Sequence, residues 1–130
     1  MSFVKRVAMV IFMERDLDAA ISFYSKLGLT TAFNLKDRWA EMHTGNLQVG
    51  LCPTTAEFDN IRTGVVFEVD NIKELYEALK DDMTFLTEPV EAIHGIMVSV
   101  KDPSGNIIDL YQPTPEKVKE AAAKASEKSE

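Results

Sequence analysis

The sequence predicts an α+β protein in which two βαβββ repeats form a curved eight-stranded mixed sheet around a cleft, followed by a C-terminal helical tail. Two observations support this prediction. A strand, a capping residue and an amphipathic helix occur in the same order near residues 3–27 and again near residues 63–79. In addition, each half ends with a Gly-Asn turn that leads into a strand closed by proline.

The first repeat is predicted from alternation and helix signals. Alternating apolar residues from Phe3 to Met13 predict a strand, and Asp16 suits a helix cap because its carboxylate can accept a backbone N–H bond. Gly28 suits the left-handed residue that ends the helix. Residues 29–36, 38–43 and 47–53 are predicted to be strands. The apolar residues at helical spacing are Leu17, Ala20, Ile21, Tyr24 and Leu27.

The second repeat follows the same order, with a strand from Thr63 to Val69 and Asn71 as the helix cap. Its later strands are predicted at residues 83–87, 95–101 and 107–113. We therefore expect one domain over residues 1–113, with repeats at about 3–53 and 63–113. Because one repeat leaves a sheet face bare, two must pair to enclose a cavity, either within the chain or with a second chain. Residues 114–130 are predicted to be a partly frayed helical tail. The helical positions are Ile72, Leu75, Tyr76 and Leu79.

Composition excludes several classes of function. The chain has 130 residues, the size of one domain, and its formal net charge of -7 disfavours nucleic acid as a partner. The longest apolar run near the start, residues 7–13, is too short to cross a membrane, so we expect a cytoplasmic protein with no membrane partner. The single cysteine, Cys52, cannot form an internal disulfide. Phosphate-binding loops and Ser-His-Asp arrangements are not present.

Two segments carry a family resemblance. The strings Glu14-Arg15-Asp16-Leu17, Ala20-Ile21-Ser22-Phe23-Tyr24 and Leu27-Gly28-Leu29 stand at the first helix, and Asp102-Pro103-Ser104-Gly105-Asn106-Ile107-Ile108-Asp109-Leu110 stands at the last strand. Together they resemble the opening and closing segments of vicinal oxygen chelate proteins, which include glyoxalases, bleomycin resistance proteins and extradiol dioxygenases. The resemblance covers about residues 3–113. It implies the paired βαβββ fold, which hosts many different functions.

The resemblance also implies where a metal would be bound. Metal-using members take one ligand from each of four strands, and these positions fall here on Met9, Gly50, Gly64 and Asp109. Only Asp109 offers an oxygen ligand, and Gln48 is the only nearby candidate for a substitute. Because a tightly held divalent metal needs at least three good protein ligands, the sequence predicts no metal site and no cofactor.

Strand alternation predicts which residues face the cleft. Rows such as Ala40 with Met42 and Val49 with Leu51 should face the helices, so the opposite rows should face the cleft. His43 is interpreted as a strand residue rather than a base, because no nearby partner in the sequence fixes its tautomer. Acidic side chains in a dry cleft would need a cation or a donor. The predicted ligand-binding residues are Trp39, Glu41, His43, Glu68, Met97, Asp109 and Tyr111.

These observations favour a metal-independent small-molecule-binding protein, similar to the bleomycin resistance branch, for a cationic or aromatic ligand. One alternative is an enzyme of the same superfamily, such as a lactoylglutathione-lyase-like enzyme, an isomerase or a dioxygenase with an atypical metal site. Another is a structural module whose cleft is filled by its own side chains. The sequence assigns no catalytic residue and leaves the identity of the ligand open. We expect a homodimer, as the resemblance implies.

Overall fold

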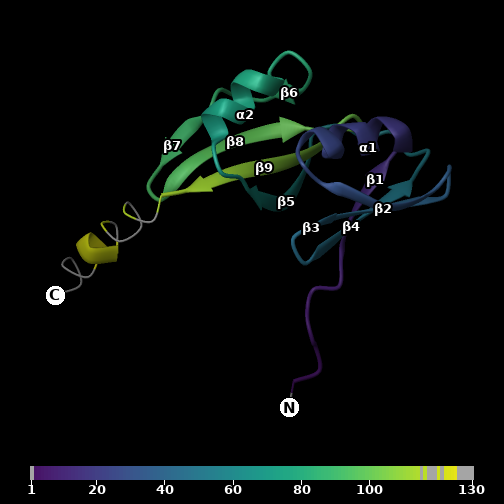
Figure 1. The fold of residues 1–130 in the computed structure, drawn as a ribbon, viewed down its shortest axis with the longest axis horizontal. Helices are drawn as coiled ribbons and strands as arrows, with labels where there is room; N and C mark the ends of the chain where they lie inside the picture. Colours follow the sequence, from purple (N-terminus) through teal and green to yellow (C-terminus); the bar gives the residue numbers. More distant parts are fainter. Residues whose placement is uncertain (1, 115, 117–119, 121, 126–130) are drawn as a thin grey trace. The chain divides into compact units, whose positions relative to one another are not determined.

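The computed structural model describes residues 2–114, 116, 120 and 122–125. The chain forms two compact units, the first comprising Met1–Ile61 with Asp102–Asn106 and the second Arg62–Lys101 with Ile107–Glu130. In each unit a helix, α1 or α2, packs on a β-sheet (Figure 1). The predicted α+β class is therefore confirmed. The described residues form two sheets, of four and five strands, instead of the single eight-stranded sheet that we expected.

The first unit is a mixed sheet with the strand order β1-β4-β3-β2. Strands β1 and β4 are parallel, whereas β3 pairs in antiparallel fashion with both β4 and β2. Asp16 caps the helix as predicted, because its carboxylate accepts a hydrogen bond from the Ala19 backbone N–H. The elements are β1 (Val10–Glu14), α1 (Leu17–Lys26), β2 (Thr30–Leu35), β3 (Trp39–Thr44) and β4 (Leu47–Pro53).

The core of the first unit lies between its sheet and α1. Phe12 of β1 stacks on Tyr24 of α1 with ring centroids 5.2 Å apart and nearly parallel planes. Ala40 and Met42 are fully buried, which confirms that this row faces the helix. The other buried apolar residues of this core are Leu17, Ala20, Phe23, Leu29, Val49 and Leu51. Their burial supplies the main driving force for folding this unit.

The first strand is shorter than predicted. Alternation predicted a strand from Phe3, but β1 begins at Val10 and residues 2–9 form no regular structure. The register pairs Val10 with Val49, and β4 begins at Leu47. Residues before Ala8 would therefore extend past the end of β4, and a strand without a partner has no ladder of hydrogen bonds to hold it.

The second unit has the strand order β5-β9-β8-β6, with β7 also paired to β8. One strand was predicted over residues 83–87, but β6 covers only Thr84–Phe85 of this range, and a second short strand, β7, follows at Val90–Ala92. Pro89 explains the interruption, because it has no N–H to donate to the ladder. The elements are β5 (Ile61–Glu68), α2 (Ile72–Leu79), β6 (Thr84–Phe85), β7 (Val90–Ala92), β8 (Gly95–Lys101) and β9 (Asn106–Pro113).

Helix α2 is fixed to its sheet at its first turn. Asn71 accepts a hydrogen bond from the Glu74 N–H, as the predicted cap requires, and the Gln112 side chain of β9 accepts one from the Ile72 N–H. The buried apolar residues of this unit are Ile72, Met83, Val98, Val100, Ile107, Ile108 and Leu110. They lie mainly on β8, β9 and α2, which therefore form the centre of the unit.

The predicted C-terminal tail falls largely outside the described residues. Residues 116, 120 and 122–125 are helical and exposed, whereas Pro115, the predicted first helical residue, is not described. No helix in the described part of the chain is long and apolar enough to cross a membrane.

Candidate functional site

The face of the first sheet that α1 does not cover carries three of the predicted ligand-binding residues. Trp39, Glu41 and His43 of β3 are half-buried there, while the intervening Ala40 and Met42 are fully buried on the helix side. Ile11 on β1 alternates with buried Phe12 and is 50% exposed. The structure thus brings these three predicted residues to one face, as strand alternation requires. We call it the open face of the first sheet.

The Trp39 indole lies over the backbone of Gly50. A Cβ atom added at Gly50 would stand only 2.4 Å from Cη2 and Cζ2 of the indole, and 3.4 Å from Ile11. Gly50 pairs with Glu41 on β3 and with Ile11 on β1. Any other residue at position 50 would therefore have to displace the indole. The two residues are complementary, because Gly50 provides the flat surface on which the ring rests.

Glu41 and His43 form a hydrogen-bonded pair on the same face. The distance from Nε2 of His43 to Oε2 of Glu41 is 3.1 Å, and the His43 side chain is 42% exposed. The expectation that His43 has no partner to fix its tautomer is therefore wrong. The sequence did contain a signal, because residues two apart in a strand share a face. Because a carboxylate only accepts hydrogen bonds, Nε2 carries the proton and Nδ1 of the neutral ring is left as an acceptor.

The remaining predicted residues, Glu68, Met97, Asp109 and Tyr111, all lie in the second unit. Asp109 accepts a hydrogen bond from Ser99, its partner across the β8–β9 pair, and lies 3.5 Å from the Arg62 guanidinium. We expected a cation or donor for this carboxylate, and the chain itself supplies both. Neither residue was predicted as a partner of Asp109, because finding these contacts requires the register between strands.

Tyr111 is anchored to the turn between β7 and β8. Its hydroxyl lies 3.1 Å from the His94 carbonyl oxygen and 3.0 Å from His94 Nδ1, and the two rings meet edge to face. Met97 pairs directly with Tyr111 across the β8–β9 ladder. Glu68 is exposed at the last residue of β5. The second unit therefore joins Met97 with Tyr111 and gives Asp109 partners that the sequence did not predict.

The residues at the implied metal positions do not fit a divalent metal. Gly50 lies beneath the Trp39 ring, Gly64 has no side chain and a positive φ of 76°, and Asp109 already bonds Ser99 and Arg62. Gln48, the candidate substitute, pairs with His43 across β3 and β4. In the described part of the chain, no three His, Cys, Asp or Glu side chains gather as a metal site would need.

A buried acidic cluster in the first unit was not predicted. Glu14 at the end of β1 is 0% exposed, and its Oε2 accepts a hydrogen bond from Asn106 Nδ2, while its Oε1 has no hydrogen-bond partner among the described residues. Asp102 accepts hydrogen bonds from the Tyr24 hydroxyl, from Asn106 Nδ2 and from the backbone N–H groups of Ser104 and Asn106. Four donors suit an ionised carboxylate at Asp102.

Glu14, in contrast, is held in its neutral form. Burial, then the close approach and the charge of the Asp102 carboxylate, raise the pKa of Glu14 from 4.5 to about 9. Burial and the same acidic neighbours also raise the pKa of the Tyr24 hydroxyl. The position of Glu14 could have been foreseen, because it lies two residues after buried Phe12 on the same side of β1.

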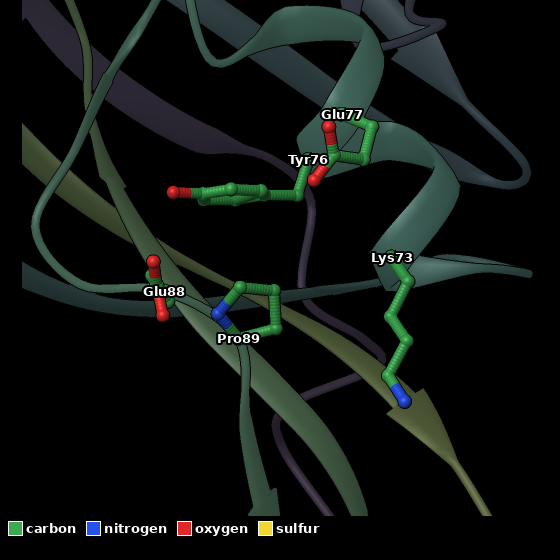
Figure 2. Close-up of a pocket in the computed structure, with 5 residues that line it drawn as sticks. All are labelled: Lys73, Tyr76, Glu77, Glu88 and Pro89. Carbon is green, nitrogen blue, oxygen red and sulfur yellow. The ribbon is translucent and has the colours of Figure 1, made fainter.

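A separate shallow groove of about 290 Å³ lies beside α2 in the second unit (Figure 2). The rings of Tyr76 and Pro89 form two of its walls. Lys80 Nζ donates a hydrogen bond to the Glu77 carboxylate at 2.7 Å, and this bond raises the pKa of Lys80. None of the seven predicted ligand-binding residues lines the groove. Its lining residues are Lys73, Tyr76, Glu77, Glu88 and Pro89.

The sequence of the chain is similar to that of a known protein family. Residues 6–110 match the family model described as the Glyoxalase/Bleomycin resistance protein/Dioxygenase superfamily. No curated protein sequence matches the chain at a significant level.

Three solved structures illustrate the similarity of fold. A bleomycin-binding protein from Streptomyces verticillus, complexed with copper(II)-bleomycin, is 22% identical, with 86% of this chain and 100% of that chain covered and a TM-score of 0.66. The fosfomycin resistance protein FosX from Listeria monocytogenes is 12% identical, with 88% and 98% covered and a TM-score of 0.75. A lactoylglutathione lyase from Agrobacterium tumefaciens is 19% identical, with 84% and 94% covered and a TM-score of 0.65.

Proposed function

Because the chain belongs to the glyoxalase/bleomycin resistance protein/dioxygenase superfamily, we propose that it is a metal-independent small-molecule-binding protein for an aromatic or cationic ligand. The proposed ligand-binding residues are Trp39, Glu41 and His43 in the first unit, with Glu68, Met97, Asp109 and Tyr111 in the second. The structurally similar proteins include one crystallised with bleomycin and one named for fosfomycin resistance.

The observation that carries this proposal is the contact between Trp39 and Gly50. At the position where the resemblance implies a metal ligand, the chain has a glycine covered by an indole. An indole offers a large, rigid surface on which a planar ligand can stack, and Trp is often used in this way at binding sites. Gly50 thus provides no side chain to bind a metal, and the Trp39 indole that covers it provides apolar contact area for a ligand.

The net charge of the chain favours a ligand that is neutral or cationic in solution. The chain has a formal net charge of -7, which attracts cations and repels anions at long range. Glu68 is exposed on β5 and can approach a cationic group. Asp109 already has Arg62 beside it, so we expect it to contribute less to cation binding than Glu68.

A thermal-shift screen combined with Trp39 fluorescence tests the proposal. We expect planar aromatic or cationic compounds to raise the melting temperature and to change the emission of Trp39, the single tryptophan. Neither effect should require added metal. If no compound in a broad screen of this kind binds, the structural-module alternative gains support and the binding function is wrong.

An enzyme of the same superfamily is the second candidate, and one observation favours it. The Glu41–His43 pair resembles the carboxylate–imidazole pairs that act as general bases, because the carboxylate fixes the tautomer of the ring. Turnover of a bound compound that is lost in His43→Gln would support catalysis. Unchanged recovery of every bound compound would support binding alone.

A further inference from the structure

Three alternate residues of β3 share one face of the sheet. They are Trp39 with its apolar indole ring, Glu41 with its carboxylate and His43 with its imidazole nitrogens. The far edge of the indole reaches Gly50, which is the cross-strand partner of Glu41. His43 lies two residues further along the strand, about 7 Å from Glu41 at the usual rise per residue. A ring stacked on the indole could therefore extend one substituent to His43.

The hydrogen bond between Glu41 and His43 determines which kind of ligand substituent His43 can bind. Glu41 is only 14% exposed at its side chain and accepts the Nε2 proton of His43. This leaves the Nδ1 lone pair of His43 as an acceptor on a ring whose side chain is 42% exposed. Nδ1 therefore suits a ligand group that donates a proton in a hydrogen bond, such as a hydroxyl.

From this row we propose that Glu41 and His43 form an acid–base dyad that takes a proton from an acidic hydroxyl group on an aromatic ligand stacked against Trp39. This inference rests on the proposed binding function and narrows its ligand class to phenols. The ligand O–H bond breaks and an Nδ1–H bond forms on His43. The phenolate then faces an imidazolium whose other N–H remains bonded to Glu41, so the total charge does not change.

The cross-strand neighbours of His43 do not compete with the dyad for the proton of the ligand. The cross-strand neighbours of His43 are Thr30 on β2 and Gln48 on β4, and neither titrates. The Gln48 amide can donate a hydrogen bond to a phenolate oxygen. A phenol also suits the overall charge, because it approaches as a neutral molecule and avoids the repulsion that a net charge of -7 imposes on anions.

Titration with 4-nitrophenol, below the pH at which the free compound ionises, tests the proposal. We expect quenching of the Trp39 fluorescence together with the yellow absorption of the phenolate, which reports the transferred proton. His43→Gln should lose the phenolate absorption and bind about tenfold more weakly, because one charge-assisted hydrogen bond is lost. The side chain of His43 is substantially exposed, so the fold should persist, and a thermal melt checks it.

Two further variants test whether the charge of Glu41, and not only its hydrogen bond to His43, is needed for proton transfer. Glu41→Gln keeps an oxygen that can accept the Nε2 proton but removes the charge, so 4-nitrophenol should still bind with much weaker phenolate absorption. Glu57→Gln, a matched change at an exposed residue of the 54–60 connection, should behave like the parent. 4-Nitroanisole has no acidic proton and should quench Trp39 equally in the parent and in His43→Gln.

The outcomes distinguish this inference from the proposed function. If 4-nitrophenol quenches Trp39 without phenolate absorption, or if His43→Gln keeps that absorption, the dyad is wrong and the binding function stands. If neither compound affects Trp39 in the parent, the dyad is wrong, and the broader screen of aromatic and cationic compounds decides the binding function separately.

Discussion

Replacing Glu14 by Gln should stabilise the protein at neutral pH and change how its stability depends on pH. In the folded state the Glu14 carboxyl has a pKa of about 9, against an ordinary value of 4.5 in the unfolded chain. Between these values the folded chain holds one more proton than the unfolded chain. The stabilisation from this raised pKa is fully present below about pH 4.5 and is lost as the pH rises toward about 9.

The size of the effect follows from proton linkage. One proton corresponds to about 1.4 kcal/mol of unfolding free energy per pH unit. The free energy of unfolding of Glu14→Gln relative to the parent should therefore rise by about 3 kcal/mol between pH 6 and pH 8. The amide is nearly isosteric with the acid, is neutral at every pH, and keeps an oxygen that can accept the hydrogen bond from Asn106 Nδ2.

Urea denaturation of both proteins at several pH values measures this difference. Comparing the variant with the parent cancels the contributions of titrating groups that do not interact with Glu14. Glu57→Gln provides a control at an exposed carboxylate, and its difference from the parent should stay near zero across the range. A difference for Glu14→Gln that does not change with pH would show that Glu14 is ionised in the folded protein and would refute the reasoning.

Further predictions concern the packing of the first unit and the assembly of the chain. Gly50→Ala should displace the Trp39 indole from the sheet and shift its fluorescence toward that of a solvated indole. It should also lower the free energy of unfolding by about 1 to 3 kcal/mol. Unchanged emission and stability would contradict the contact between Trp39 and Gly50. Arg15→Gln should speed hydrogen exchange in residues 54–61 and lower the free energy of unfolding by about 1 to 3 kcal/mol. The reason is that the guanidinium donates hydrogen bonds to the carbonyls of Ala56, Phe58 and Ser104 and lies over the Phe58 ring. Unaltered exchange in these residues would contradict this role. Light scattering coupled to size exclusion should give the mass of a homodimer, and a mass near one 14.5 kDa chain at micromolar concentration would contradict it.

The local elements of the fold could be predicted because their signals lie within short stretches of sequence. Asp16 and Asn71 cap the two helices as their positions before apolar helical repeats indicate. The length of β1 could not be predicted, because alternation records only which residues could form a strand. The strand also needs a partner, and β4 is too short to provide one for Phe3.

The candidate site was partly predictable for the same reason. Alternation alone placed Trp39, Glu41 and His43 on one face, and buried Ala40 and Met42 on the other. The bonds of Asp109 to Ser99 and Arg62 depend on the register of three strands, which the sequence does not state.

The buried cluster joins residues far apart in the sequence. Glu14 meets Asp102 and Asn106 only because Asp102–Asn106 folds into the first unit, although the strands on either side of it lie mainly in the second. Local patterns could indicate that Glu14 points inward, but not which donors would surround it.

Ligand titration of chelator-treated protein, with elemental analysis of the same sample, tests the central claim of metal-independent binding most directly. We expect no stoichiometric transition metal in protein that has never contacted a metal-affinity resin. Binding of an aromatic compound, followed by Trp39 fluorescence, should have the same affinity before and after treatment with the chelator. One equivalent of zinc, nickel, iron or manganese per chain, lost together with ligand binding in Asp109→Ala, would contradict the account.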